Sequence, residues 1–442
     1  MNNLNFLVDV LKESPVFKTL EKNVKPGRTV CASGLSTINK SNIIYALCRL
    51  KGVTAFCLAS DEKEAQTLCN DLSCMGLRAY VYPVRDFNFL DFQSRSHEYE
   101  HARLKVLLKL LNHECDVAIA CVDAAAQLTV PRNVLEQSVI EFEEGRELSL
   151  EKATKALTLL GYERFDAVEG SGQFSLRGGI LDFFMPDSDY PVRCEFWGDE
   201  ITDLSYFDIE TQRRFKKADK ITLSPSTEIV IEDRAALADK IEHKAKLLRS
   251  KNSAKAKEKL FSEAELIRSG AMIANADKFI NQIYDKPESL FDYFDRNTLV
   301  FASEFTAIQE RGKSMDFISN ETLMQGFEDG TLCRGFDRFA LTFNECTEFL
   351  QSHGTIVLEN FVHGSMPIKL SEIISFSTKQ LSAWGGSYKQ LKEDVDGLFT
   401  PESKGVIFAG TERAAKNLCD TFNADGINAV YSEGADKISK GE

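Results

Sequence analysis

The sequence lacks the long apolar segments and processing signals of membrane and secreted proteins. Its longest apolar runs, such as residues 117–122, have the length of a strand and stay far below the roughly 20 residues of a membrane-spanning helix. The first residues, MNNLN, provide neither the basic stretch nor the small-residue cleavage site of a signal peptide. We therefore expect a cytoplasmic protein that makes no contact with a membrane.

Paired cysteines and an excess of basic residues are also missing. The 11 cysteines form no Cys-x-x-Cys pair, and several lie inside apolar stretches, so we expect reduced, buried thiols. The 53 lysines and arginines are outnumbered by 67 aspartates and glutamates, which gives a net charge of −14. Such a surface repels a phosphate backbone and disfavours tight nonspecific DNA binding by this chain alone. A protein is therefore the first candidate partner.

Glycine and proline are sparse, with 26 and 10 copies among 442 residues, so the linkers must be short. At roughly 100–200 residues per domain, this length predicts two to four domains. Residues 28–126 alternate apolar strands with amphipathic helices, which is typical of a parallel α/β sheet of the Rossmann or RecA type. The strands are expected at 29–32, 54–59, 79–82 and 117–122, and the helices at 41–50, 62–73 and 101–111.

The pattern changes near Pro131. From 139 to 223, short alternating strands are separated by Gly-Gly, Pro-Asp and Gly-Asp turns, with one helix at 149–160. This pattern predicts a small α+β domain with an antiparallel sheet. Helical sequence follows over 234–283, and an apolar strand at 297–301 indicates that the first α/β domain resumes after an insertion.

Near the end of the chain we expect strands at 405–411 and 426–431, separated by a helix and a glycine stop, which is the order of elements also found over 52–80. Any β-α-β unit produces this order, so a true internal repeat and a chance likeness both stay open. We predict an α/β protein in which a RecA-like (P-loop NTPase-type) parallel sheet domain is interrupted by a small α+β domain and followed by a second small α/β domain. The expected borders are 1–127 and 225–330 for the first domain, 128–224 for the inserted one and 335–442 for the last.

A glycine-containing loop follows the first expected strand and opens a helix. It fits the phosphate-loop pattern G-x-x-x-x-G-K-[ST] through Gly34, Lys40 and Ser41. Asn39 stands where the pattern requires glycine, because the backbone must approach the phosphates closely there. The strand at 299–303 leads into Ala-Ser-Glu, where an aspartate for Mg²⁺ is needed. We expect a degenerate loop that does not hydrolyse nucleotide; a working ATPase is the alternative.

A second short motif is H-E-x-x-H, formed by His97, Glu98 and His101. In zinc proteases two histidines one helical turn apart bind the metal and the glutamate activates water. Here the motif begins a helix that we expect to be exposed, and no third ligand is evident nearby. Acidic residues in a first helical turn are also favoured by the helix dipole. We therefore expect a solvated helix start and no metal site, and we assign no catalytic residue.

One segment of the predicted insertion is dense in unusual residues. Because side chains alternate along a strand, Phe174 and Leu176 are expected in the core, and Ser175 and Arg177 on the opposite face. We expect Arg164 near them on the neighbouring strand. Exposed arginines on a rigid sheet are suited to bidentate contacts with carboxylates of a partner. The alternative is an ordinary solvated sheet face.

The same segment resembles the amino-terminal part of bacterial transcription-repair coupling factors. The resemblance is carried by GYER at 161–164, FSLRGGILDFF at 174–184, EFWGDEI at 195–201 and FDIETQR at 207–213. These motifs are highly specific. The flanks fit more loosely, and residues 335–442 resemble the family mainly by position and by the order of their elements.

This resemblance implies a module similar to the excision-repair protein UvrB, in which a RecA-like domain is interrupted by a small domain that binds UvrA. In the family the module is catalytically dead. By motif, Arg164 and Arg177 match arginines that face UvrA in the related proteins, whereas Ser175 stands where UvrB has another arginine. The hairpin with which UvrB probes damaged DNA would fall between Asp86 and His97, where only a short loop is present.

The resemblance thus implies that the chain recruits UvrA to RNA polymerase stalled at a lesion. In the whole family protein, a carboxy-terminal translocase hydrolyses ATP with Mg²⁺, moves on double-stranded DNA and releases the polymerase. The chain ends at Glu442, before the expected polymerase-binding domain and motor, so we expect a fragment without a cofactor of its own. The alternatives are an ATP-binding helicase half and a UvrB-type damage-recognition subunit.

Overall fold

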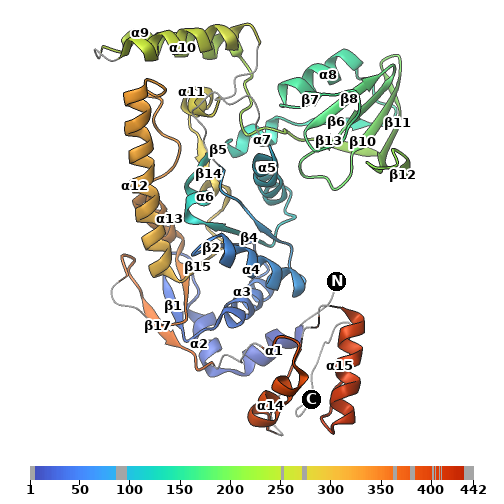
Figure 1. Ribbon diagram of the computed structural model, residues 1–442, viewed down its shortest axis with the longest axis vertical. Coiled ribbons are helices and arrows are strands. Elements are labelled where there is room, and N and C mark those ends of the chain that lie inside the picture. Colours follow the sequence, from blue (N-terminus) through green and yellow to red (C-terminus); the bar gives the residue numbers. More distant parts are fainter. Residues whose placement is uncertain are drawn as a thin grey trace.

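The computed structural model describes most of the chain. The described residues are 5–85, 97–249, 253–270, 276–361, 366–378, 384–400, 403, 405–407, 409 and 411–432. Among them, no helix combines the length and the apolar character needed to cross a membrane. The molecule is elongated: a large sheet lies in its lower half, a second domain projects near the top, and the long helix α12 (Phe305–Asp329) runs along the opposite side (Figure 1).

The large sheet contains seven parallel strands in the order β17-β1-β16-β15-β2-β4-β3. Their bounds are β1 (Val30–Ser33), β2 (Ala55–Ala59), β3 (Ala79–Val81), β4 (Val117–Cys121), β15 (Leu299–Ser303), β16 (Thr355–Glu359) and β17 (Glu372–Ser375). The central strands are buried along their whole length, which explains their unbroken apolar sequences. The chain leaves this sheet after β4 and returns to it at β15.

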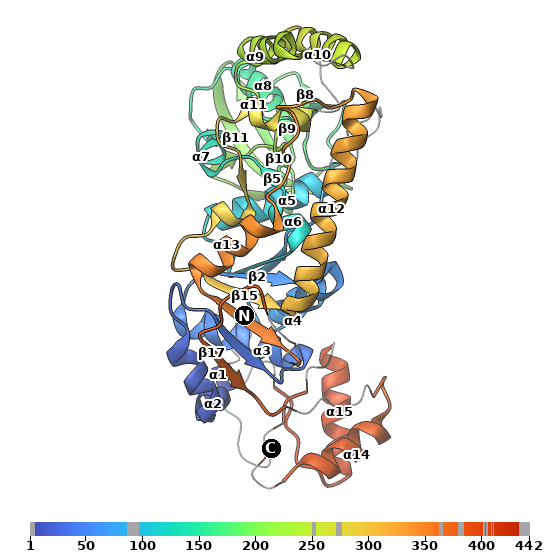
Figure 2. The ribbon, with the colours of Figure 1, turned by 90° about the vertical axis from the view of Figure 1, so that its left-hand side faces the viewer.

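Helices cover both faces of the large sheet (Figure 2). One face is packed by α1 (Asn5–Glu13), α2 (Pro15–Asn23), α3 (Thr37–Lys51) and α4 (Glu62–Cys74). The other is packed by α5 (Glu98–Leu111), α6 (Val122–Ala126), α12 and α13 (Phe343–His353). Local sequence fixes the helix ends. The Asp61 carboxylate accepts the backbone N–H of Glu64 at the start of α4, and Gly52 ends α3 with a φ of 63°.

The second domain has its own sheets and its own apolar core. Its main sheet has the order β12-β11-β10-β9-β8-β7, and only the β7–β8 pair is parallel. The strands are β7 (Glu163–Arg164), β8 (Gln173–Arg177), β9 (Ile180–Phe183), β10 (Val192–Trp197), β11 (Glu200–Phe207) and β12 (Arg214–Lys217). Strands β6 (Ile140–Glu143) and β13 (Lys220–Leu223) pair separately, and helix α8 (Leu150–Leu159) completes the domain. The predicted small α+β unit is confirmed.

Short elements connect the second domain to the large sheet. Strand β5 (Leu128–Thr129) and helix α7 (Arg132–Gln137) precede it. It is followed by α9 (Arg234–Leu247), α10 (Ser253–Arg268), η1 (Ala276–Phe279), α11 (Ile280–Ile283), β14 (Glu288–Ser289) and η2 (Leu290–Tyr293). Helices α9 and α10 lie together at the top of the molecule (Figure 1), and β14 pairs with β5. The mixed α/β architecture predicted from the sequence is confirmed.

The structure corrects the expected start of the last domain at 335. Strands β16 and β17 belong to the large sheet, because the apolar β16 fills the gap between β1 and β15. Beyond them, α14 (Tyr388–Leu398) and α15 (Glu412–Ala424) pack through Tyr388 and Phe422, whose ring centroids are 5.5 Å apart. The described residues of the strands expected at 405–411 and 426–431 contain no strand.

The expectation of buried thiols holds for most of the cysteines. All 11 are free thiols, and most are buried in the two cores of the large sheet. Cys74, at the end of α4, is exposed instead.

Candidate functional site

The candidate nucleotide loop joins β1 to α3, as its sequence predicts. Its backbone N–H groups are used within the protein: that of Gly34 donates to the Asn360 carbonyl at 3.1 Å, and that of Leu35 donates to the Glu359 carbonyl at 3.0 Å. Gly34 has a φ of 79°, and a Cβ atom there would lie 2.0 Å from the backbone oxygen of Phe376. The residues after β17 therefore pack closely against the start of the loop.

The polar residues of the loop also have internal partners. The Asn39 side-chain amide donates to Ser36 Oγ at 2.8 Å, and Ser41 Oγ donates to Asp71 Oδ2 at 2.9 Å. In a working phosphate loop the hydroxyl at the position of Ser41 binds Mg²⁺ instead. This loop is thus held in one conformation by its own hydrogen bonds.

Lys40 is buried and surrounded by carboxylates. Its Nζ lies 2.6 Å from Glu304 Oε1 and 3.3 Å from Glu64 Oε1, and it donates to Ser303 Oγ at 2.9 Å. Only 4% of the Lys40 side chain is exposed. The charge that would meet a phosphate in a nucleotide site is paired here with two carboxylates of the protein. Glu304 holds this contact with a φ of 55°, an uncommon conformation for a residue with a side chain.

Glu359 completes this buried cluster at the carboxyl end of β16. Its Oε1 accepts the backbone N–H of Phe305 at 2.8 Å, while its Oε2 has no hydrogen-bond partner among the described residues. Burial, together with the negative charge of Glu304, raises the pKa of Glu359 to about 7. The carboxyl group therefore changes charge near neutral pH.

The H-E-x-x-H motif begins α5 but does not form a metal site among the described residues. His97 Nδ1 lies 2.9 Å from Glu100 Oε2, and His101 packs against Gly172 of the second domain. The expectation of a solvated first turn is wrong for Glu100, which is buried. Burial alone would raise the pKa of Glu100, but the hydrogen bond with His97 and the charge of Arg85 outweigh it and lower the pKa.

A buried ionic network that the sequence did not predict lies behind this motif. Arg103 and Glu228 are fully buried, and Arg103 Nε donates to Glu228 Oε1 at 2.6 Å. Arg85 joins them through Glu100 at 3.3 Å and Asp277 at 2.5 Å. Glu228 lies just after the second domain, so the network fixes the exit of that domain against α5. Its members are far apart in the sequence, and no spacing pattern reveals them.

Arg177 lies at the end of β8, where half of its side chain is exposed. Its guanidinium donates to Asp182 Oδ2 at 2.8 Å, while Arg193 binds both oxygens of the same carboxylate at 2.7 and 2.8 Å. Arg193 is also covered by the ring of Phe207, 4.4 Å away. Two guanidinium groups thus share one buried carboxylate, and Arg177 is the one that reaches solvent.

Arg164 is exposed as well, but the structure does not bring it onto the face of Arg177. It is in register with Phe174, whose side chain lies in the core. By alternation along β8, Arg177 lies on the other face. Ser175 shares that face but is buried, and its hydroxyl donates to the Asp166 carbonyl at 2.8 Å. Ser175 therefore offers nothing to a partner.

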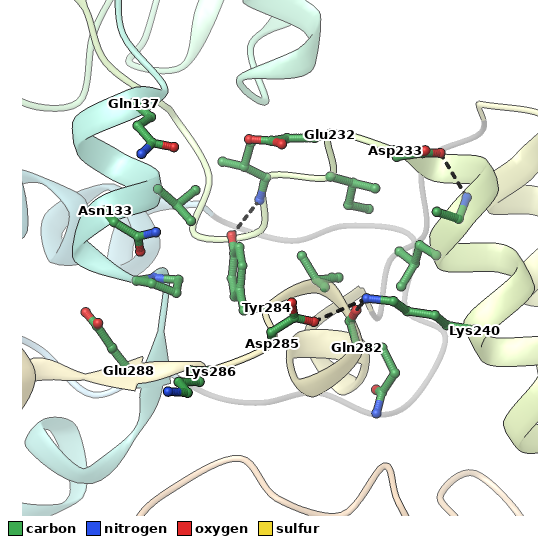
Figure 3. A pocket seen from close by; sticks show the side chains of 17 residues that line it. Asn133, Gln137, Glu232, Asp233, Lys240, Gln282, Tyr284, Asp285, Lys286 and Glu288 are labelled. Atoms are coloured by element: carbon green, nitrogen blue, oxygen red, sulfur yellow. Dashed lines mark hydrogen bonds and ion pairs between the residues drawn. The ribbon is translucent and has the colours of Figure 1, made fainter.

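A cavity of about 580 Å³ lies where the chain leaves the second domain, between α7, α9 and α11. Figure 3 shows that polar side chains of the cavity have partners among its lining residues. Lys240 pairs with Asp285 at 3.4 Å, and the Val230 N–H donates to the Tyr284 hydroxyl at 2.9 Å. The remaining labelled groups do not converge on one point. We assign no chemistry to this cavity.

Comparisons with known proteins point to one family. Residues 140–229 match the family model of the UvrB interaction domain. The transcription-repair-coupling factor of Bacillus subtilis is 25% identical over 446 residues, which cover 98% of this chain and 37% of that protein. Its counterpart in Staphylococcus epidermidis is 24% identical over 79% of this chain and 30% of its own length. The chain thus spans about a third of the length of these curated relatives.

The family match coincides with the second domain, whose strands run from β6 to β13. The coupling factors align with the large sheet as well, because they cover nearly the whole chain. The resemblance found in the sequence is therefore confirmed: this chain carries a UvrB interaction domain and is similar over almost its full length to bacterial transcription-repair-coupling factors.

Proposed function

We propose that this chain recruits UvrA in transcription-coupled nucleotide excision repair, and that it does so by binding, without bond chemistry. The observation that carries the proposal is the second domain. It matches the UvrB interaction domain, has its own core, and presents Arg177 on a sheet face. A rigid sheet holds a guanidinium in one place, and a guanidinium binds a carboxylate of a partner bidentately.

The longer relatives suggest the setting of this step. Their name links transcription to repair, and we propose that the remainder of such a protein contacts RNA polymerase and double-stranded DNA and hydrolyses ATP with Mg²⁺ as a translocase. The present chain would then bring UvrA to a polymerase stalled at a lesion in the cytoplasm. It would need no cofactor, because the start of the loop at Gly34 is closely packed and Lys40 is already paired with carboxylates.

Calorimetric titration of the purified chain with UvrA tests the proposal. We expect binding with a dissociation constant in the micromolar range or below, and a loss of most of it in the Arg164→Ala/Arg177→Ala double variant. The single variants separate the two sites, and we expect Arg177→Ala to account for most of the loss. Absence of binding by the unchanged chain would contradict the proposal.

An ATP-binding helicase half is the competing function, and thermal denaturation separates it from ours. A ligand that binds only the folded state raises the melting temperature. We expect ATP with Mg²⁺ to leave the melting temperature unchanged, because internal groups fill the loop. A rise that disappears in Lys40→Met would establish a nucleotide site instead. The third possibility, a UvrB-type damage sensor, depends on a hairpin whose position at 86–96 lies outside the described residues.

A further inference from the structure

Trp197 is the most exposed of the large apolar side chains that the structure describes, with 82% of its surface accessible. It is the last residue of β10 and precedes the tight turn at Gly198, which has a φ of 62°. Burying an indole stabilises a complex through its large apolar area, and tryptophan is strongly enriched among the residues that dominate protein interfaces. An exposed indole on a rigid hairpin is therefore a candidate contact residue for a partner protein.

The turn that carries Trp197 lies beside the turn that follows Arg177. The backbone N–H of Phe196 donates to the Gly179 carbonyl at 2.8 Å, which joins the two hairpins. The contact is so close that a Cβ atom on Gly179 would lie 2.7 Å from the Phe196 oxygen. Only glycine permits this approach, so the sequence Gly178-Gly179 fixes Arg177 and Trp197 at the same end of the sheet.

Both side chains also project from the same face. Arg177 is in register with Ile180, and Ile180 is in register with Glu195. Trp197 follows Glu195 by two residues, so it shares that face, while Phe196 between them is buried in the core. Arg177 and Trp197 thus form one continuous surface next to the two turns.

The charges on this surface indicate what it binds. Glu195 is paired with Arg214, which also binds Asp203 at 3.0 Å, so two carboxylates share one guanidinium there. At the other side, the single carboxylate of Asp182 serves both Arg177 and Arg193. The surface therefore combines an exposed indole with the half-exposed guanidinium of Arg177, which shares its carboxylate with a second arginine.

We infer that Trp197 is a central contact residue of the UvrA-binding surface: its indole enters an apolar recess of the partner, next to a carboxylate that binds Arg177. This inference rests on the proposed function. Arg164 lies on β7, in register with Phe174 and thus on the other face of the sheet from both residues, so we expect it to contribute less than they do.

The test compares Trp197→Ala with Phe215→Ala in the calorimetric titration with UvrA. Phe215 is a matched control, because it is 53% exposed in the same domain and lies on β12, which pairs with β11 near Tyr206 at the opposite end of the sheet. We expect Trp197→Ala to weaken binding at least about tenfold and Phe215→Ala to leave it unchanged. Trp197→Ala should leave the melting temperature unchanged, and Phe215→Ala should lower it only slightly, through the lost ring contact with Tyr190.

A second measurement follows Trp197 itself. The chain has 2 tryptophans, so Trp384→Phe leaves Trp197 as the single site for a tryptophan analogue that is excited apart from the tryptophans of UvrA. We expect the binding of UvrA to shift the fluorescence emission of the analogue at position 197 to shorter wavelengths and to protect the analogue from quenching by acrylamide. If the chain binds UvrA while Trp197→Ala binds equally well and the analogue stays quenchable, the inference is wrong and the proposed function stands. If the unchanged chain does not bind, both are wrong.

Discussion

Two regions of this molecule carry recognisable motifs, and they differ in what their polar side chains do. At the loop after β1, Lys40 is buried among carboxylates and the N–H groups of Gly34 and Leu35 are bonded to backbone carbonyls. On the sheet of the second domain, Arg177 and Trp197 reach solvent. The first motif keeps the letters of a ligand site, and in this structure its lysine and two of its N–H groups bond to other groups of the protein. The second presents an exposed indole and a half-exposed guanidinium that is also paired with Asp182.

This difference also appears in the way each region is supported. The loop is closed by β16 and β17, strands that lie more than three hundred residues along the chain from β1. Opening it for a ligand would expose buried charges and break strand contacts. In the second domain the apolar core lies on the other face of the sheet, and the Asp182–Arg193 pair lies beside Arg177 on the same face.

The largest expected effect tests whether the loop is closed. Gly34 and Gly52 both have a positive φ, but a Cβ atom on Gly34 would meet the Phe376 oxygen at 2.0 Å, whereas nothing lies within 4 Å at Gly52. We expect Gly52→Ala to lower the free energy of unfolding by about 1 kcal/mol through backbone strain alone. Gly34→Ala should lower it by more than about 3 kcal/mol, because a backbone atom must also move. Chemical denaturation measures both, and equal losses would show that the loop is open in solution.

A smaller expected effect is the dependence of the free energy of unfolding on pH, which arises from the buried carboxyl group of Glu359. The pKa of Glu359 is about 7 in the folded protein, against an ordinary value of 4.5. The folded chain therefore binds this proton more tightly than the unfolded chain does. As a result, the free energy of unfolding falls as the pH rises from about 4.5 to about 7.

Glu359→Gln should remove this dependence, since the amide oxygen still accepts the Phe305 N–H but carries no charge. We expect the variant to be more stable than the unchanged chain by about 3 kcal/mol at pH 8, and the difference to fall below about 1 kcal/mol at pH 5. Denaturant titrations across this pH range measure the difference. Glu348→Gln, at an exposed position on α13, is the control and should follow the unchanged chain. A loss of stability in Glu359→Gln at high pH would mean that its negative charge is needed.

Features that depend on neighbouring residues could be predicted from the sequence alone. Periodicity and turn residues predicted the loop before α3, the helix α8 and the strands β8 to β10, because these depend on neighbours in the sequence. The alternation of Phe174 and Arg177 about β8 is likewise a local property, and it is confirmed. The contacts that hold this loop could not be predicted, because β17 and Glu359 are distant from it in the sequence and approach it only in the folded chain.

Burial was the other property that the sequence could not predict. Glu100 and Arg103 look like solvated residues of an amphipathic helix, yet both are buried, because Glu228 and Thr227 supply partners from another part of the chain. Arg164 and Arg177 look alike in the motif, and only the register of β7 with β8 separates their faces. A charged residue is therefore assigned to a surface only when its partners are known.

The smallest expected effect concerns the support of the partner surface. Arg177 and Arg193 both bind Asp182, but half of the Arg177 side chain is exposed and only 13% of Arg193 is. Arg177→Ala should lower the free energy of unfolding by less than about 1 kcal/mol, because Arg193 still pairs the buried carboxylate. Arg193→Ala also removes the contact with Phe207 and should cost about 2–3 kcal/mol. Equal losses in thermal denaturation would show that Arg177 belongs to the support, and its exposure would then no longer distinguish this sheet from the closed loop.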